Sequence, residues 1–231
     1  MTDPPALLLA VDLLVRGDRE VLQTIGRSLQ VSLTAASIAF VLGAPCGGWL
    51  AVVRFPGRWA VLVMVNAALG LPPVVVGLVV YLTLSRAGPL GALDLLFTPL
   101  AMVLAQTMLA LPIVVALVHR AATSLWSEYG DALTIDGASR RRAAAVVLAM
   151  MGPGLVTAFL AAFGRAIAEV GALLVVGGNI AGVTRTMTTA IALETSKGDL
   201  PRALAFGMIL IALTIGVTGA AFLVGRLAER R

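Results

Sequence analysis

The stretch SLQVSLTAASIAFVLGAPCGGWLAVV, residues 28–53, contains no charged side chain. A helix that crosses the hydrocarbon core of a bilayer needs about 20 consecutive apolar residues. The stretch exceeds that length, and Arg27 and Arg54 bound it on either side. It therefore predicts a transmembrane helix, and the rest of the chain can be searched for runs of the same kind.

Three other runs of comparable length also lack charge when His119 is counted as neutral: residues 59–85, 95–119 and 203–225. A further apolar region, residues 143–184, is interrupted only by Arg165 and Glu169. The apolar runs are continuous, whereas the strands of a membrane β-barrel alternate apolar and polar residues. Open strands are also excluded, because they would leave backbone hydrogen-bonding groups unsatisfied in lipid. We therefore predict an all-α integral membrane protein with about five transmembrane helices.

The composition supports this fold class. Of the 231 residues, 59% are hydrophobic and only 13% are charged. A soluble domain of this size could not hide so much apolar surface. The arginines are scattered at the ends of the apolar runs without interleaved aromatic residues, so we expect no nucleic-acid partner. The one histidine, His119, has no cysteine or acid nearby in the sequence, so we expect no metal site.

The N-terminal segment differs from the other apolar runs. Residues 6–15, ALLLAVDLLV, are too short to cross a bilayer and are split by Asp12. We expect an amphipathic helix on the membrane surface, with a sixth transmembrane helix as the alternative. The expected organisation is an N-terminal amphipathic, periplasmic segment, residues 1–27, followed by one transmembrane domain, residues 28–231.

The charge distribution predicts the orientation. With five membrane crossings and the N-terminus outside, nine basic residues fall on the inner face and seven on the outer face. The positive-inside rule favours the face with more arginine and lysine. We therefore expect the N-terminus outside and the C-terminus inside a bacterial or archaeal cytoplasmic (inner) membrane.

A polar segment interrupts the chain near its middle: EYGDALTIDGASRRRAAAVV, residues 128–147. In one interpretation it is a solvated loop, about residues 120–145, whose arginines fix the orientation. In the other interpretation the segment docks on a partner protein. Aromatic side chains that anchor an interface, a glycine that allows a sharp turn, and solvent-exposed charges all suit such a docking element. The candidate docking residues are Trp126, Tyr129, Asp131, Ala132, Asp136, Gly137, Ala138 and Arg140.

This segment resembles the EAA loop of ABC importer permeases, whose pattern is Glu-Ala-Ala, three residues, Gly. Here Asp131 stands for the glutamate, Leu133 for the second alanine, and Gly137 for the glycine. The family's later Leu-Pro is missing, since no proline follows until Pro153. The resemblance implies a short coupling helix that turns at the glycine and docks in a groove of an ATPase subunit.

Two longer stretches extend the resemblance over nearly the whole chain. Residues 71–91, LPPVVVGLVVYLTLSRAGPLG, look like a span of molybdate and tungstate permeases, and residues 163–200 are similar to the tungstate branch. The resemblance implies the type I ABC permease fold and tungstate import, with molybdate or sulfate as alternatives. It also implies a homodimer, two ATPase subunits, surrounding membrane lipid and a periplasmic or lipid-anchored oxyanion-binding protein.

Several polar residues in or after the fourth apolar region are candidates for the anion pathway or its gate: Arg165, Glu169, Asn179, Thr184, Thr186 and Thr188. Arg165 and Glu169 are four residues apart, so we expect them to share one helix face. Ionisable groups inside a membrane either face a cavity or pair with each other. Threonine hydroxyls could bind a tetrahedral oxyanion or simply cap helices. Both interpretations remain open for each set.

The chain lacks the phosphate-binding loop of an ATPase. That loop needs a Gly-x4-Gly-Lys-Ser/Thr pattern, and the only lysine, Lys197, has no such glycine frame. We therefore expect a transporter subunit that is not itself an enzyme and binds no cofactor, with ATP-Mg used by a partner ATPase. The rival classes are a secondary anion carrier built on Arg165 and Glu169, and a small membrane enzyme.

Overall fold

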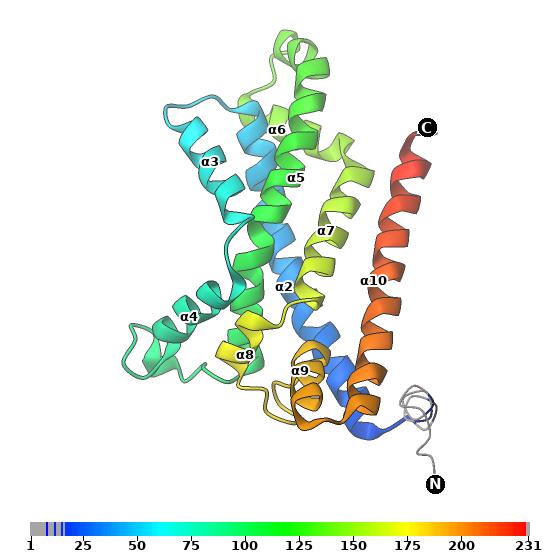
Figure 1. Cartoon of the computed structure of the whole chain (residues 1–231). Helices are drawn as coiled ribbons and strands as arrows, with labels where there is room; N and C mark the ends of the chain where they lie inside the picture. Colours follow the sequence, from blue (N-terminus) through cyan, green and yellow to red (C-terminus); the bar gives the residue numbers. More distant parts are fainter. Residues whose placement is uncertain (1–7, 9–11, 13–14, 16, 230–231) are drawn as a thin grey trace. The chain divides into compact units, whose positions relative to one another are not determined.

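The computed structural model describes Leu8, Asp12, Val15 and residues 17–229, and within these the regular structure is entirely helical (Figure 1). The expected surface helix over residues 6–15 lies largely outside the described residues. The helices are α2 Arg19–Val52, α3 Arg58–Ala68, α4 Pro73–Leu84, the 3-10 turn η1 Gly91–Leu93, α5 Pro99–Ile135, α6 Arg140–Met150, α7 Gly152–Ile167, α8 Gly171–Gly177, α9 Met187–Lys197 and α10 Leu200–Glu229.

Three of these helices, α2, α5 and α10, are long and apolar enough to cross a membrane. Two bent pairs, α3 with α4 and α6 with α7, raise the number to five if each pair counts as one crossing. The structure therefore agrees with the prediction of about five spans. It differs at the boundaries, because α2 begins at Arg19 and so includes part of the segment that we assigned to the N-terminal region.

Proline explains the sharpest break. The pair α3 and α4 bends by 103° at the sequence Gly70-Leu71-Pro72-Pro73. Pro72 is the N-cap of α4 and Pro73 is its first residue, a position where the missing N–H costs nothing. Pro112, by contrast, lies inside α5 without ending it. The bend of 79° between α6 and α7 occurs at Met151 and Gly152, directly before Pro153.

The described chain divides into two compact units. One contains the residues up to 34 together with residues 72–106 and 166–216. Within this unit α4 packs closely on α8 (Figure 1). A Cβ at Gly77 would lie 2.8 Å from Ala172 Cα, and one at Gly171 would lie 2.6 Å from Val74 Cγ2. The two helices approach so closely because glycine faces the partner helix at each crossing.

The other unit contains residues 35–71, 107–165 and 217–231. Here Gly43 and Gly47 of α2 lie against α5, and Gly48 of α2 lies against Leu148 of α6. A Cβ at Gly47 would lie 2.7 Å from the Val115 carbonyl oxygen, which is too close for any real contact. The glycines of the first apolar run therefore serve helix packing within the chain, as small residues commonly do in membranes.

We predict that Gly47→Ala lowers the melting temperature of the detergent-solubilised protein, because overpacking against backbone costs about 1–3 kcal/mol. Gly207→Ala in α10 is the matched control, since a Cβ there meets nothing within 4 Å. Thermal unfolding followed by circular dichroism measures both variants. An unchanged melting temperature for Gly47→Ala would contradict the close α2–α5 approach.

Candidate functional site

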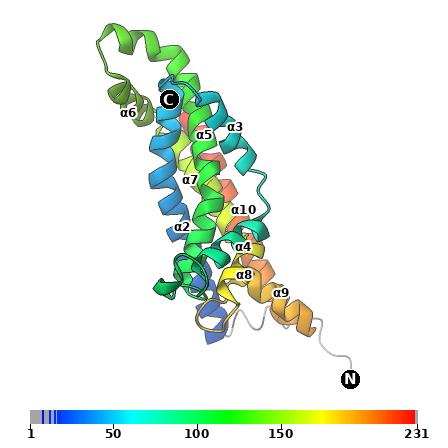
Figure 2. The same ribbon diagram turned by 90° about the vertical axis from the view of Figure 1, so that its left-hand side faces the viewer.

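The predicted docking segment forms a helical hairpin with a tight turn. It was expected as a loop with a short helix over residues 120–145. That expectation is wrong in detail, because α5 continues without interruption to Ile135 and α6 begins at Arg140. Trp126, Tyr129, Asp131 and Ala132 therefore lie on the last turns of a long helix, and Arg140 opens the next helix. Figure 2 shows α6 folding back from the turn.

Gly137 makes the turn, as the sequence predicted. Its φ of +72° lies in the left-handed region, which glycine adopts without a Cβ penalty. Gly137 N–H donates to the Thr134 carbonyl at 3.1 Å, and Ala138 N–H donates to the Leu133 carbonyl at 3.0 Å. These two bonds form a Schellman motif, which satisfies the last carbonyls of α5. The side chain of Ser139 then accepts from Arg142 N–H and caps α6.

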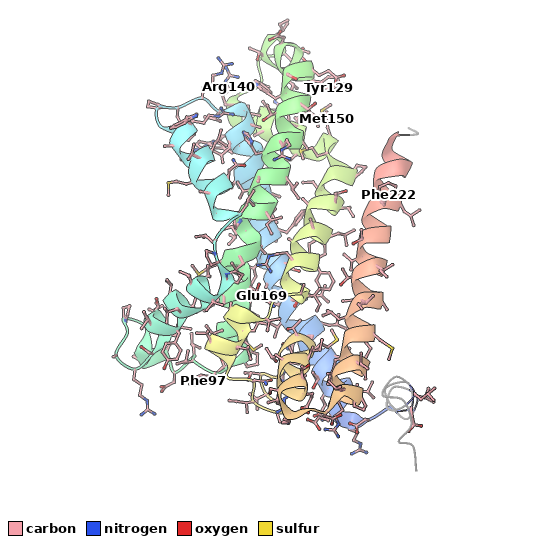
Figure 3. All side chains as sticks on the ribbon, viewed as in Figure 1. Phe97, Tyr129, Arg140, Met150, Glu169 and Phe222 are labelled. Atoms are coloured by element: carbon pink, nitrogen blue, oxygen red, sulfur yellow. The ribbon has the colours of Figure 1, made fainter. Side chains whose placement is uncertain are left out.

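The side chains around the turn are mostly exposed. Asp131, Ala132 and Asp136 are open to solvent, and Tyr129 is 39% exposed. Trp126 is different, because its ring is half-buried and lies under the Arg140 guanidinium at 5.4 Å from Cζ to the ring centroid. This cation–π contact joins the two arms of the hairpin. Figure 3 shows Tyr129 and Arg140 in this part of the chain.

The sequence reasoning missed Ile135. This apolar side chain is 85% exposed at the last residue of α5, directly before the turn. It is flanked by the polar residues Thr134 and Asp136, so it projects an isolated apolar side chain at the tip of the hairpin. The signal was present in the sequence as an apolar residue flanked by polar ones. Its location at the tip of the hairpin required the structure.

The predicted pathway residues lie around α8 and the loop before α9. Arg165 lies in the last turn of α7, but α7 ends at Ile167. Glu169 is therefore beyond the helix, and the expectation that the two residues share one helix face is wrong. Glu169 is buried, and its Oε1 accepts from Ala172 N–H at 3.2 Å in the first turn of α8. A carboxylate suits this position because the first N–H groups of a helix lack partners.

The three predicted threonines are buried and make internal hydrogen bonds. The Thr184 hydroxyl donates to the Gly177 carbonyl and accepts from Ile180 N–H at 2.9 Å. The Thr188 hydroxyl donates to the Glu169 carbonyl at 2.7 Å. The Thr186 hydroxyl lies 3.1 Å from that of Thr189, and Thr186 N–H donates to Thr189 Oγ1 at 3.0 Å at the start of α9. In this structure these groups form a buried hydrogen-bond network, in which Thr184 and Thr186 lie at helix ends and Thr188 binds the segment between α7 and α8.

Asn179 completes the network. It has a positive φ of 51°, which asparagine tolerates better than most residues. Its Nδ2 donates to the Thr189 carbonyl at 3.3 Å. The loop is also fixed to α2, since Met187 N–H donates to Ser28 Oγ at 2.7 Å. The structure thus brings Glu169, Asn179 and the threonines together, as one capped polar loop.

A charged cluster that the sequence did not predict lies in the same unit. Arg185 Nη1 is 2.7 Å from Glu20 Oε1, and Arg202 Nη1 is 3.7 Å from Glu20 Oε2. Glu20 belongs to the first turn of α2, so the cluster joins α2, the loop before α9 and the start of α10. Residues so distant in sequence give no local signal of pairing.

The long apolar helices are those of a membrane-embedded protein, and similarity to known proteins assigns its class. The chain matches the family described as "binding-protein-dependent transport system inner membrane component" over residues 39–230, and it belongs to that family. Its fold is therefore the type I ABC permease fold. As expected, the chain is a transporter subunit and not an enzyme, and the rival carrier and enzyme classes find no support.

Individual relatives agree with the family. The chain is 45% identical to a probable anion ABC transporter permease protein of Haloferax volcanii, over 82% of this chain and 84% of the relative. It is 36% identical to a tungstate uptake system permease protein of Peptoclostridium acidaminophilum, over 90% of this chain and 91% of the relative. A tungstate permease protein of Campylobacter jejuni is 35% identical, over 87% and 84%.

We predict that Glu169→Ala destabilises the protein by about 1–3 kcal/mol, because it leaves the buried Ala172 N–H without its acceptor. Glu128→Ala is the control, since Glu128 is exposed on α5. The melting temperature in detergent and the transport rate in proteoliposomes measure the effect. Equal and negligible effects of the two substitutions would contradict a special role for Glu169.

Proposed function

We propose that this chain is the membrane subunit of an ABC importer for tungstate. The assignment of tungstate as the substrate rests on the similarity to tungstate permeases, which extends over nearly the whole chain. Relatives with 28 or 29% identity are named as permeases of molybdenum or sulfate transport systems. All three anions are tetrahedral dianions, so molybdate or sulfate is the second candidate substrate.

The family to which the chain belongs works with a binding protein and an ATPase, and the chain needs both to import. We propose that two copies of the chain form the pathway, that two ATPase subunits hydrolyse ATP-Mg, and that a periplasmic or lipid-anchored protein delivers the anion. We place the N-terminus outside, so that the hairpin at Gly137 faces the cytoplasm. Its three consecutive arginines, residues 140–142, favour that side.

The hairpin is the proposed contact with the ATPase. Ile135 offers an exposed apolar anchor, and the exposed Tyr129 lies six residues earlier in the last turns of the same helix. Asp131, Asp136 and Arg140 remain solvated when undocked and are available for pairing when docked. Anchors of this kind supply most of the affinity of a protein interface, while charges set its orientation.

Because the turn is hydrogen-bonded to the end of α5, we propose that α5 moves together with the hairpin. The Schellman motif connects the turn directly to a helix that continues from Pro99 to Ile135. A helix transmits displacement along its axis because each turn is hydrogen-bonded to the next. A shift of the docked turn would therefore displace α5 and favour either inward or outward access of the pathway.

The pathway residues belong to the same proposal. Arg165 and Glu169 are proposed to lie beside the anion route, with Asn179, Thr184, Thr186 and Thr188 holding the loop that follows. In this role the threonines act by shaping the loop, because their hydroxyls are engaged in hydrogen bonds within it. Transport needs weak binding, so a site in which few donors face the anion suits rapid release.

The first test compares two glycines that both have a left-handed backbone conformation. We predict that Gly137→Val prevents co-purification of the ATPase, because valine in the left-handed region costs about 1–2 kcal/mol and opens the turn. Gly57→Val is the control, since Gly57 has a φ of +85° in another turn and also faces open space. Retention of the ATPase by Gly137→Val, or equal loss in both variants, would contradict the docking role.

The second test identifies the substrate. The permease and its ATPase are reconstituted in liposomes, and ATP hydrolysis is measured with binding protein loaded with tungstate, molybdate or sulfate. We expect stimulation by the tungstate-loaded form alone. Stimulation by all three anions would retain the importer and remove the tungstate assignment, and stimulation by none would contradict the oxyanion proposal.

A further inference from the structure

A cavity of about 300 Å³ lies between α3 and α5. It lies within one compact unit, and its lining comes from residues to which the proposed function gives no role: Leu62, Val65, Asn66, Ala116, His119, Arg120 and Thr123. A tetrahedral anion with part of its hydration shell fits within that volume.

Arg58, which is not itself one of the lining residues, determines which ring nitrogen of His119 carries the proton. Arg58 Nη2 lies 3.2 Å from His119 Nε2. A guanidinium only donates hydrogen bonds, so Nε2 must be the accepting nitrogen and Nδ1 carries the proton. Arg58 Nε also donates to the Leu50 carbonyl at 2.8 Å, which holds the guanidinium against the imidazole. The ring is therefore a neutral donor beside a fixed positive charge.

Arg120 supplies a second positive charge at the cavity. Its side chain is exposed, and within the described part of the chain we find no ion pair that engages it. The lining also contains no carboxylate. Asn66 and Thr123 each hold an intrahelical bond, to the Leu62 and His119 carbonyls respectively, and the Asn66 amide keeps a second N–H. The lining thus combines positive charge with neutral donors.

A second cavity in the other unit provides a contrast. It has a volume of about 440 Å³ and is lined by Tyr81, Ser85, Arg86 and Asp94, among others. Asp94 places a carboxylate in the same lining as Arg86, which disfavours an incoming anion by like-charge repulsion. Of these two cavities, the smaller one has the charge that suits an anion.

We propose that the cavity between α3 and α5 binds a tetrahedral oxyanion group, with Arg120 as the main ligand. The group has two possible sources with the same chemistry. One is the transported dianion, met at the proposed cytoplasmic end of its route, and this source rests on the proposed function. The other is the phosphate of an anionic membrane lipid, whose chains would cover Leu62, Val65 and the exposed Trp59 of α3.

The experiment uses the whole permease–ATPase complex in nanodiscs, without binding protein. Sodium tungstate is titrated in zwitterionic phosphatidylcholine nanodiscs and in nanodiscs that contain phosphatidylglycerol, and bound tungstate is measured by equilibrium dialysis. Native mass spectrometry reports retained phosphatidylglycerol. We expect Arg120→Gln to weaken the binding of the ligand about tenfold or more, because a hydrogen bond to a charged group contributes at least that factor.

Two further variants make the result specific. Arg120→Lys keeps the charge but loses the two-pronged guanidinium, so we expect partial loss. Arg86→Gln removes one positive charge from the other cavity and should leave binding unchanged. Elution of each variant as a monodisperse complex establishes that it is folded. Should Arg120→Gln not fold, Asn66→Ala, which removes the free amide N–H, and Arg120→Lys measure the same site.

The possible outcomes distinguish between the two sources of the oxyanion group, and they also test whether the binding site exists. Arg120-dependent tungstate binding in both lipids supports the free anion as ligand. Arg120-dependent retention of phosphatidylglycerol, with tungstate bound only in phosphatidylcholine, supports the lipid phosphate. Binding of neither ligand, or equal binding by wild type and Arg120→Gln, overturns the site. Stimulation of the ATPase by tungstate-loaded binding protein is measured separately, so the importer proposal can stand or fall independently.

Discussion

The constraint that governs this structure is the absence of hydrogen-bond partners in lipid. Every backbone N–H and C=O within the membrane must find its partner in the protein, so the long apolar runs of the described residues are mostly helical. The constraint is most demanding where a helix stops. After α7 the buried Glu169 accepts from the first turn of α8, and Thr188 donates back to the Glu169 carbonyl. Polar side chains inside an apolar protein are thus explained first by helix ends.

Glycine meets a second demand of the same environment. Without a hydrophobic driving force between helices, association depends on close contact. Gly47 faces the backbone of α5, and Gly77 faces the backbone of α8. Gly137 has the opposite role, because nothing would contact its Cβ and only its left-handed conformation matters. The same residue type therefore packs helices in one place and turns the chain in another.

The arginines are also used in different ways, according to what lies beside them. Arg185 is engaged by Glu20. Arg140 stacks on Trp126 and joins the two arms of the hairpin. Arg58 holds His119 in one tautomer, and Arg120 faces a cavity that has no carboxylate in its lining. The net charge of +5 does not predict these different roles of the arginines, because each role depends on which helices pack together.

The sequence by itself determined the fold class, the approximate spans and the turn at Gly137. Each of these follows from local chemistry: the length of an apolar run or the freedom of glycine at positive φ. Only the tertiary structure decided that Glu169 lies beyond α7, that the threonines are buried and hydrogen-bonded to the surrounding loop, and that Ile135 is exposed. Those facts depend on where a helix ends in space and on what packs against it, and residues far apart in the chain supply the answer.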